Sequence, residues 1–156
     1  MIQLAPRGWA GLATPAVRYL AVMVGLNLLW EVAQLPLYTL WAEGTPGEIA
    51  FAVLHCTGGD AMIAAAALAT AILLTRCWHW PRQGWGSVTM VATLIGLSYT
   101  VFSEWLNVDV RQSWTYTAAM PRLPPWGTRL APFLQWLLLP PFAMLAARSP
   151  TRLFAR

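Results

Sequence analysis

The chain has 156 residues, of which 58% are hydrophobic and 10% are charged, whereas an average soluble domain has about 25% charged residues. Every basic residue is an arginine, and the arginines cluster at the ends of long apolar runs, where they set membrane topology. The net charge of +4 therefore does not indicate a nucleic-acid-binding protein, and the composition predicts an all-α integral membrane protein in a lipid bilayer.

Four apolar runs are each close to the roughly 20 residues that cross a bilayer as a helix. The predicted spans are residues 17–41, 49–75, 87–108 and 130–147. They leave no room for a separate soluble domain, so residues 1–156 are predicted to form a single four-helix transmembrane bundle. The longest connection, residues 109–129, joins the third and fourth spans and is expected on the outer side.

The orientation follows from the arginines. Seven of them lie before or at the start of the first span, between the second and third, or after the fourth: Arg7, Arg18, Arg76, Arg82, Arg148, Arg152 and Arg156. Short loops on the cytoplasmic side of a membrane carry more positively charged residues than loops on the other side. We therefore predict cytoplasmic N and C termini and expect a bacterial inner-membrane protein.

The first span carries one polar stripe. Asn27, Glu31, Gln34 and Tyr38 follow one another at helical spacing and so share one face. A charged side chain near the centre of a membrane helix costs about 2.5–3.5 kcal/mol on insertion scales. A carboxyl group at this place therefore indicates a polar site inside the bundle.

The later spans place polar residues at a similar depth. They are His55 and Asp60 in the second span, Tyr99, Ser103, Glu104 and Asn107 in the third, and Gln135 in the fourth. Neighbouring spans run in opposite directions, so all of these residues fall between the outer surface and the midplane. The inner halves of the same spans are almost purely apolar, which argues against an ion pathway through the whole membrane.

We interpret this cluster as an acid/base site. Glu31 and Glu104 are predicted to be the acid/base pair, with Asp60 and His55 tuning or relaying protons. The residues expected to position a substrate are Gln34, Tyr38, Tyr99, Ser103, Asn107 and Gln135. A lipid or isoprenoid-like substrate fits, because the bundle leaves little room for an aqueous pocket, and the reaction would be an isomerisation, a cyclisation or a hydrolysis.

Two other interpretations stay open. The side chains of Glu31, His55, Asp60 and Glu104 are also a ligand set for a divalent metal, although the Glu-x-x-His pairs of carboxylate bundles and an HExxH motif are absent. Alternatively, the protein is a non-catalytic accessory or assembly subunit. Its buried polar groups would then pair with a partner helix, a second copy of the chain, a quinone or a pigment.

The outer connection also has two interpretations. It can lie on the lipid surface as an interfacial segment, or it can cover the polar site as a lid. In the second case Arg111 or Arg122 would be available for an anionic group. The sequence does not separate these two possibilities.

Overall fold

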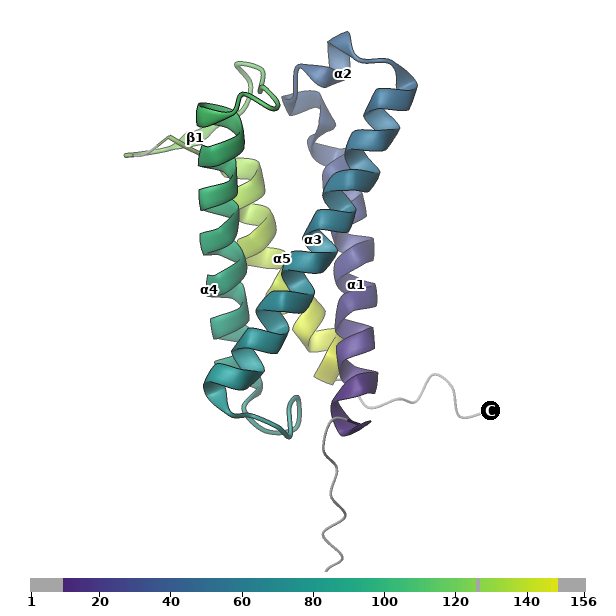
Figure 1. The fold of residues 1–156 in the computed structure, drawn as a ribbon, viewed down its shortest axis with the longest axis vertical. Coiled ribbons are helices and arrows are strands. Elements are labelled where there is room, and N and C mark those ends of the chain that lie inside the picture. The colour runs from purple at the N-terminus through teal and green to yellow at the C-terminus, as the bar shows by residue number, and fades with distance from the viewer. Residues whose placement is uncertain (1–9, 126, 149–156) are drawn as a thin grey trace, which may run out of the picture.

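The computed structural model describes residues 10–125 and 127–148. Within them, four long helices form a bundle: α1 (Ala10–Gln34), α3 (Pro46–Thr75), α4 (Trp85–Glu104) and α5 (Leu130–Arg148) (Figure 1). With the turns that extend them, the apolar spans are Leu12–Leu37, Pro46–Thr75, Trp85–Val110 and Leu130–Arg148, each long and apolar enough to cross a membrane. The predicted four-helix membrane bundle is confirmed.

The first helix begins and ends earlier than predicted. It ends at Gln34 and not near Trp41, because Pro36 has no backbone N–H to continue the helical hydrogen bonds. A 3-10 turn (Leu35–Leu37) and the short helix α2 (Leu40–Glu43) follow. Tyr38, between them, has an extended backbone and pairs with Tyr116 as an isolated β-bridge.

Local sequence signals define the start of α3. The Thr45 hydroxyl accepts a hydrogen bond from the Glu48 backbone N–H at 3.3 Å, and the Glu48 carboxylate accepts one from the Thr45 N–H at 2.8 Å. This reciprocal capping box, with Pro46 in the first turn, satisfies backbone donors that the helix itself cannot. The helix then runs unbroken through Gly58 and Gly59.

α4, which is the third membrane span, changes from α-helical to π-helical geometry where it approaches the outer connection. After Glu104 it continues as a π-helical turn (Trp105–Val110), a feature that often accompanies functional sites. The connection beyond it contains one small antiparallel hairpin, β1 (Arg122–Leu123) and β2 (Thr128–Arg129), in which Arg122 faces Arg129.

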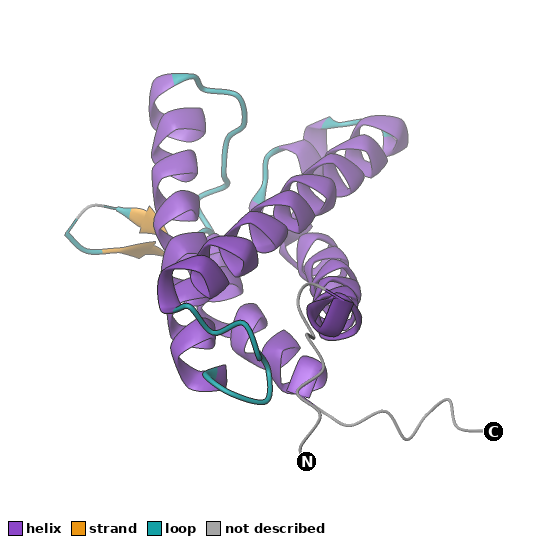
Figure 2. Ribbon diagram, turned by 60° about the horizontal axis from the view of Figure 1, so that its bottom comes forward, coloured by secondary structure: helices purple, strands orange, loops and turns teal. Residues whose placement is uncertain are grey.

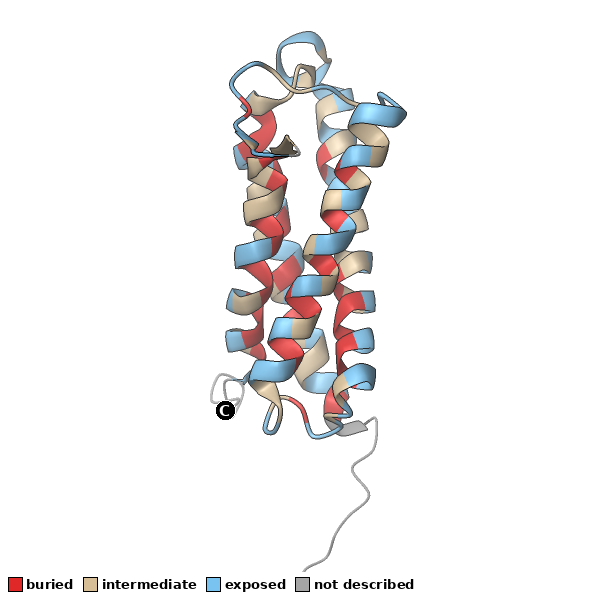
Figure 3. Ribbon diagram, turned by 90° about the vertical axis from the view of Figure 1, so that its left-hand side faces the viewer, coloured by how far each residue is buried: buried red, intermediate tan, exposed pale blue. Residues whose placement is uncertain are grey.

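The apolar core lies toward one end of the bundle, which we call the inner end; the outer end carries residues 35–45 and 111–129. Its most deeply buried members are Tyr19, Met23, Ala64, Ala67, Ala71, Trp80, Val88, Ala92, Ala143 and Met144. Small residues allow the helices to approach closely. Figure 3 shows buried residues on the inward helix faces and exposed ones outside, where large apolar side chains such as Leu29 and Met62 meet the lipid.

The helices separate toward the outer end. In Figures 1 and 2, α3 crosses near α4 at the inner end and leans away from it toward the outer end. α1 begins and α5 ends at the inner end. α3 and α4 are therefore farther apart at the outer end, which is also where the polar side chains lie.

Candidate functional site

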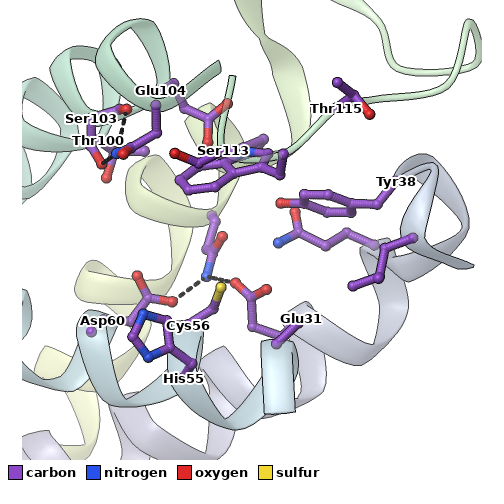
Figure 4. Close-up of a pocket in the computed structure, with 18 of the residues that line it drawn as sticks. Glu31, Tyr38, His55, Cys56, Asp60, Thr100, Ser103, Glu104, Ser113 and Thr115 are labelled. Atoms are coloured by element: carbon purple, nitrogen blue, oxygen red, sulfur yellow. Dashed lines mark hydrogen bonds between the residues drawn. The ribbon is translucent and has the colours of Figure 1, made fainter. Parts of the chain in front are cut away.

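A cavity of about 740 Å³ occupies the outer half of the bundle, where α3 and α4 diverge. α1, α3, α4 and α5 form its walls, and residues 112–115 of the outer connection cover part of it. All ten predicted site residues line this one cavity: Glu31, Gln34, Tyr38, His55, Asp60, Tyr99, Ser103, Glu104, Asn107 and Gln135. Figure 4 labels Glu31, Asp60 and Glu104 among them. Their individual roles stay predictions.

Gln135 of α5 joins three helices at the floor of the cavity. Its side chain is 3% exposed, and its Nε2 lies 2.9 Å from Asp60 Oδ2, 3.2 Å from Glu31 Oε1 and 2.8 Å from Asn27 Oδ1. The Asn27 amide nitrogen in turn donates to the Met23 carbonyl at 2.8 Å, which orients the Asn27 oxygen toward Gln135. One amide group therefore fixes both carboxyl groups against each other.

The Glu31 and Asp60 carboxyl groups are coupled through this shared donor. The other polar side chains near them are neutral: the Gln34 amide beside Glu31 and the Trp136 indole beside Asp60. Two carboxyl groups held together by neutral donors are suited to share or exchange a proton.

Glu104 lies on the opposite side of the cavity from this pair (Figure 4). The Tyr116 hydroxyl donates to Glu104 Oε2 at 2.9 Å and lies 3.0 Å from the Tyr38 hydroxyl, and the two tyrosine rings are 4.4 Å apart. Burial, and next the charge of Glu104, raise the pKa of Tyr116, so its hydroxyl keeps the proton that it donates. The closest carboxyl partner of Glu31 is thus Asp60 and not Glu104.

The ion pair between Arg129 and Asp109 lies next to the Tyr116 ring. Arg129 is 5% exposed and makes two hydrogen bonds to Asp109, at 2.7 and 2.6 Å, while its guanidinium carbon lies 6.0 Å from the centre of the Tyr116 ring. The bond to Asp109 raises the pKa of Arg129, so the guanidinium stays charged. This bidentate pair positions the residue that hydrogen-bonds Glu104.

The outer connection is fastened over the cavity. The Thr39 N–H donates to the Thr115 carbonyl at 3.1 Å, and the Thr117 N–H donates to the Leu37 carbonyl at 2.9 Å, on either side of the Tyr38–Tyr116 bridge. The segment therefore acts as a cover. Neither Arg111 nor Arg122, which the lid interpretation made available to an anion, lines the cavity; both are exposed.

His55 and Tyr99 lie on the exposed walls. The His55 ring stacks on Phe51 with centroids 5.4 Å apart, and Tyr99 is half-exposed. Within residues 10–125 and 127–148, the ion pair that the structure shows is Arg129–Asp109, so His55 is not paired with a carboxylate. A proton relay through His55 thus has no contact that supports it here.

The metal interpretation gains no geometric support. In the described part of the chain, no three side chains of His, Cys, Asp or Glu converge as ligands for one ion. Glu31 and Asp60 share Gln135, whereas Glu104 is held by Tyr116, so the proposed ligand set is divided between two sides of the cavity.

Several residues at the site were missed from the sequence. Trp136 follows Gln135 directly and lines the cavity, and Asn27 belongs to the polar stripe of the first span, so both carried a signal. Tyr116 and Arg129 carried no such signal in the sequence, because local periodicity does not predict the path of a long connection.

No protein-family model, curated protein or solved structure matches this chain. The functional argument therefore rests on the site itself.

Proposed function

We propose that this protein is an intramembrane acid/base enzyme that acts on a lipid or isoprenoid-like molecule. The observation that carries the proposal is a cavity inside an apolar bundle that is lined by three carboxyl groups, those of Glu31, Asp60 and Glu104. Hydrogen bonding between helices alone would be served by Ser, Thr or Asn, without a charged group in the membrane and without a cavity beside it.

The Glu31–Asp60 pair is the proposed proton-transfer centre. One member acts as the acid and the other as the base, while Gln135 keeps both oriented through its amide nitrogen. Glu104, with Tyr116 and Tyr38, forms a second proton-bearing group across the cavity. This assignment replaces the pairing of Glu31 with Glu104, because Glu31 and Asp60 share the Gln135 donor, whereas Glu104 accepts from Tyr116.

The charge around the cavity favours isomerisation or cyclisation over hydrolysis. Ester hydrolysis builds negative charge on oxygen and needs positive groups or N–H donors directed at it. Among the described residues, no arginine lines the cavity, and the Gln135 amide is already directed at the carboxyl groups of Glu31 and Asp60. Proton addition to a carbon–carbon double bond builds positive charge instead, which carboxylates stabilise. Removal of a proton from the neighbouring carbon then yields an isomer, with no net gain or loss of protons.

The dimensions agree with a small lipid-like substrate. A cavity of about 740 Å³ falls within the range of about 300–1,000 Å³ that ligand sites occupy. We also propose, from the arginine distribution, that the termini are cytoplasmic, as expected for a bacterial inner-membrane protein, so that the cavity belongs to the outer leaflet.

Deuterium incorporation tests this proposal without a known substrate. The protein is placed in nanodiscs with lipid extract in D₂O, and lipids that acquire non-exchangeable deuterium are identified by mass spectrometry. Wild type should label a lipid species, and Glu31→Gln and Asp60→Asn should abolish the labelling. Arg122→Gln, at an exposed polar side chain that does not line the cavity, is the control and should retain it. Labelling that is absent in wild type, or equal in all variants, contradicts the proposal.

A further inference from the structure

We propose that the cavity binds an amphiphile with a protonated amine headgroup, whose alkyl chain leaves between α3 and α4 beside Gly59. The inference names the ligand class of the site described above. It rests on the proposed function for the location of that site, but it concerns binding and not turnover.

The distribution of charge is the first argument. The chain has six acidic residues, and five of them line this cavity: Glu31, Glu43, Glu48, Asp60 and Glu104. The sixth, Asp109, pairs with Arg129. The chain as a whole carries a net charge of +4, yet the lining contains no arginine in the part that the structure describes. A cavity lined by one sign of charge attracts a ligand of the opposite sign.

The acidic residues are arranged from the mouth to the floor. Glu43 and Glu48 are exposed at the outer end, whereas Glu31 and Glu104 are buried deeper. A cation that enters from the membrane surface would therefore meet carboxylates both at the exposed end of the cavity and at its buried end.

Aromatic rings complete this environment. Five of them line the cavity: Tyr38, Phe51, Tyr99, Trp114 and Trp136. The faces of aromatic rings attract ammonium groups, and the attraction grows when water is excluded. Carboxylates together with aromatic rings thus favour an ammonium group over a neutral alcohol.

Gln34 supplies an independent observation. Its side chain is 4% exposed and lines the cavity together with Glu31. Its Oε1 is buried without a hydrogen-bond partner. Buried acceptors in folded proteins are nearly always paired. An N–H donor from a ligand would satisfy this oxygen, whereas a carboxylate or phosphate oxygen would not.

Gly59 provides the path for the alkyl chain. It lines the cavity on α3, and a Cβ built on it would meet nothing within 4 Å. Gly58 is equally unobstructed but does not line the cavity. The glycine step is thus not used for helix packing within this chain. The proposed path for the alkyl chain therefore passes beside Gly59, where α3 and α4 both line the cavity.

Competitive binding in neutral-lipid nanodiscs tests the inference. Hexadecylamine, hexadecanol and hexadecanoate have equal chain lengths and differ only in the headgroup, and native mass spectrometry counts the bound molecules. Gly59→Leu fills the proposed path, so its effect on the bound count tests where the alkyl chain leaves the cavity. Gly58→Leu adds the same side chain on the neighbouring position and is the control for folding and helix propensity.

We expect hexadecylamine to bind about tenfold more tightly than hexadecanol, and hexadecanoate to bind least. Gly59→Leu should abolish the preference and Gly58→Leu should keep it. Equal binding of the three compounds, a preference for hexadecanoate, or equal effects of the two leucine variants would overturn the inference. If the amine binds but no lipid incorporates deuterium, the proposed catalytic function is wrong and the proposed ligand class stands.

Discussion

The Gln135 amide of α5 donates to the Asp60 carboxylate of α3 at 2.9 Å. The same nitrogen lies within hydrogen-bond distance of Glu31 on α1, so three helices depend on a single side chain. This contact sets the distance between the two carboxyl groups and therefore what the pair can do chemically. The consequences for stability and function can be measured separately.

Replacement of Gln135 by leucine should destabilise the bundle and abolish deuterium incorporation. Leucine keeps the volume but leaves the Glu31 and Asp60 carboxyl groups without their shared donor. We expect a loss of about 1–2 kcal/mol, the upper range for a hydrogen bond between membrane helices. Reversible unfolding in mixed detergent micelles measures it. Gln83→Leu, at an exposed site, is the control, and an equal effect of both variants would contradict the bridging role.

Alkaline destabilisation should depend on the Tyr38–Tyr116 pair. Burial raises the pKa of each phenol above the usual 10.0, so the fold favours the protonated forms. The stability that they contribute is present below about pH 10 and is lost as the pH rises toward the folded-state pKa. Tyr116→Phe should therefore reduce the fall in unfolding free energy between neutral pH and about pH 11. An unchanged fall would argue against ionisation of this pair.

The hairpin of the outer connection offers a matched pair of arginines. Arg129 is buried and bonded to Asp109, whereas Arg122, its partner in the strand register, is exposed. Arg129→Gln should cost about 1.5–3 kcal/mol, because hydrogen bonds to a charged group are lost. Arg122→Gln should change stability by less than about 0.5 kcal/mol. Urea unfolding in detergent compares them, and equal values would show that the ion pair does not hold the cover.

Gly96 lets the Trp136 ring lie directly against α4. A Cβ at this position would overlap the indole carbons, so Gly96→Ala should displace Trp136 from the cavity wall. We expect a destabilisation of about 1–3 kcal/mol from overpacking. Gly86→Ala, in the same helix with nothing near its Cβ, should instead be neutral or slightly stabilising. The two variants are compared by thermal unfolding and by the tryptophan emission wavelength.

Much of this protein is determined by local sequence. Apolar runs set the four spans, and helical spacing places Asn27, Glu31 and Gln34 on one face, because both patterns depend only on neighbouring residues. The alternating direction of the spans then collects the polar groups in the outer half. For this reason all ten predicted site residues line one cavity.

The partners of those residues were decided only by the tertiary structure. The relative tilt and rotation of helices come from non-local packing, such as Gly96 against Trp136, and they open the space between α3 and α4. The same tilt and rotation place Asp60, and not Glu104, on the Gln135 amide that also contacts Glu31. The path of the outer connection, which delivers Tyr116 to Glu104 and Arg129 to Asp109, follows from long-range hydrogen bonds that leave no periodic trace in the sequence.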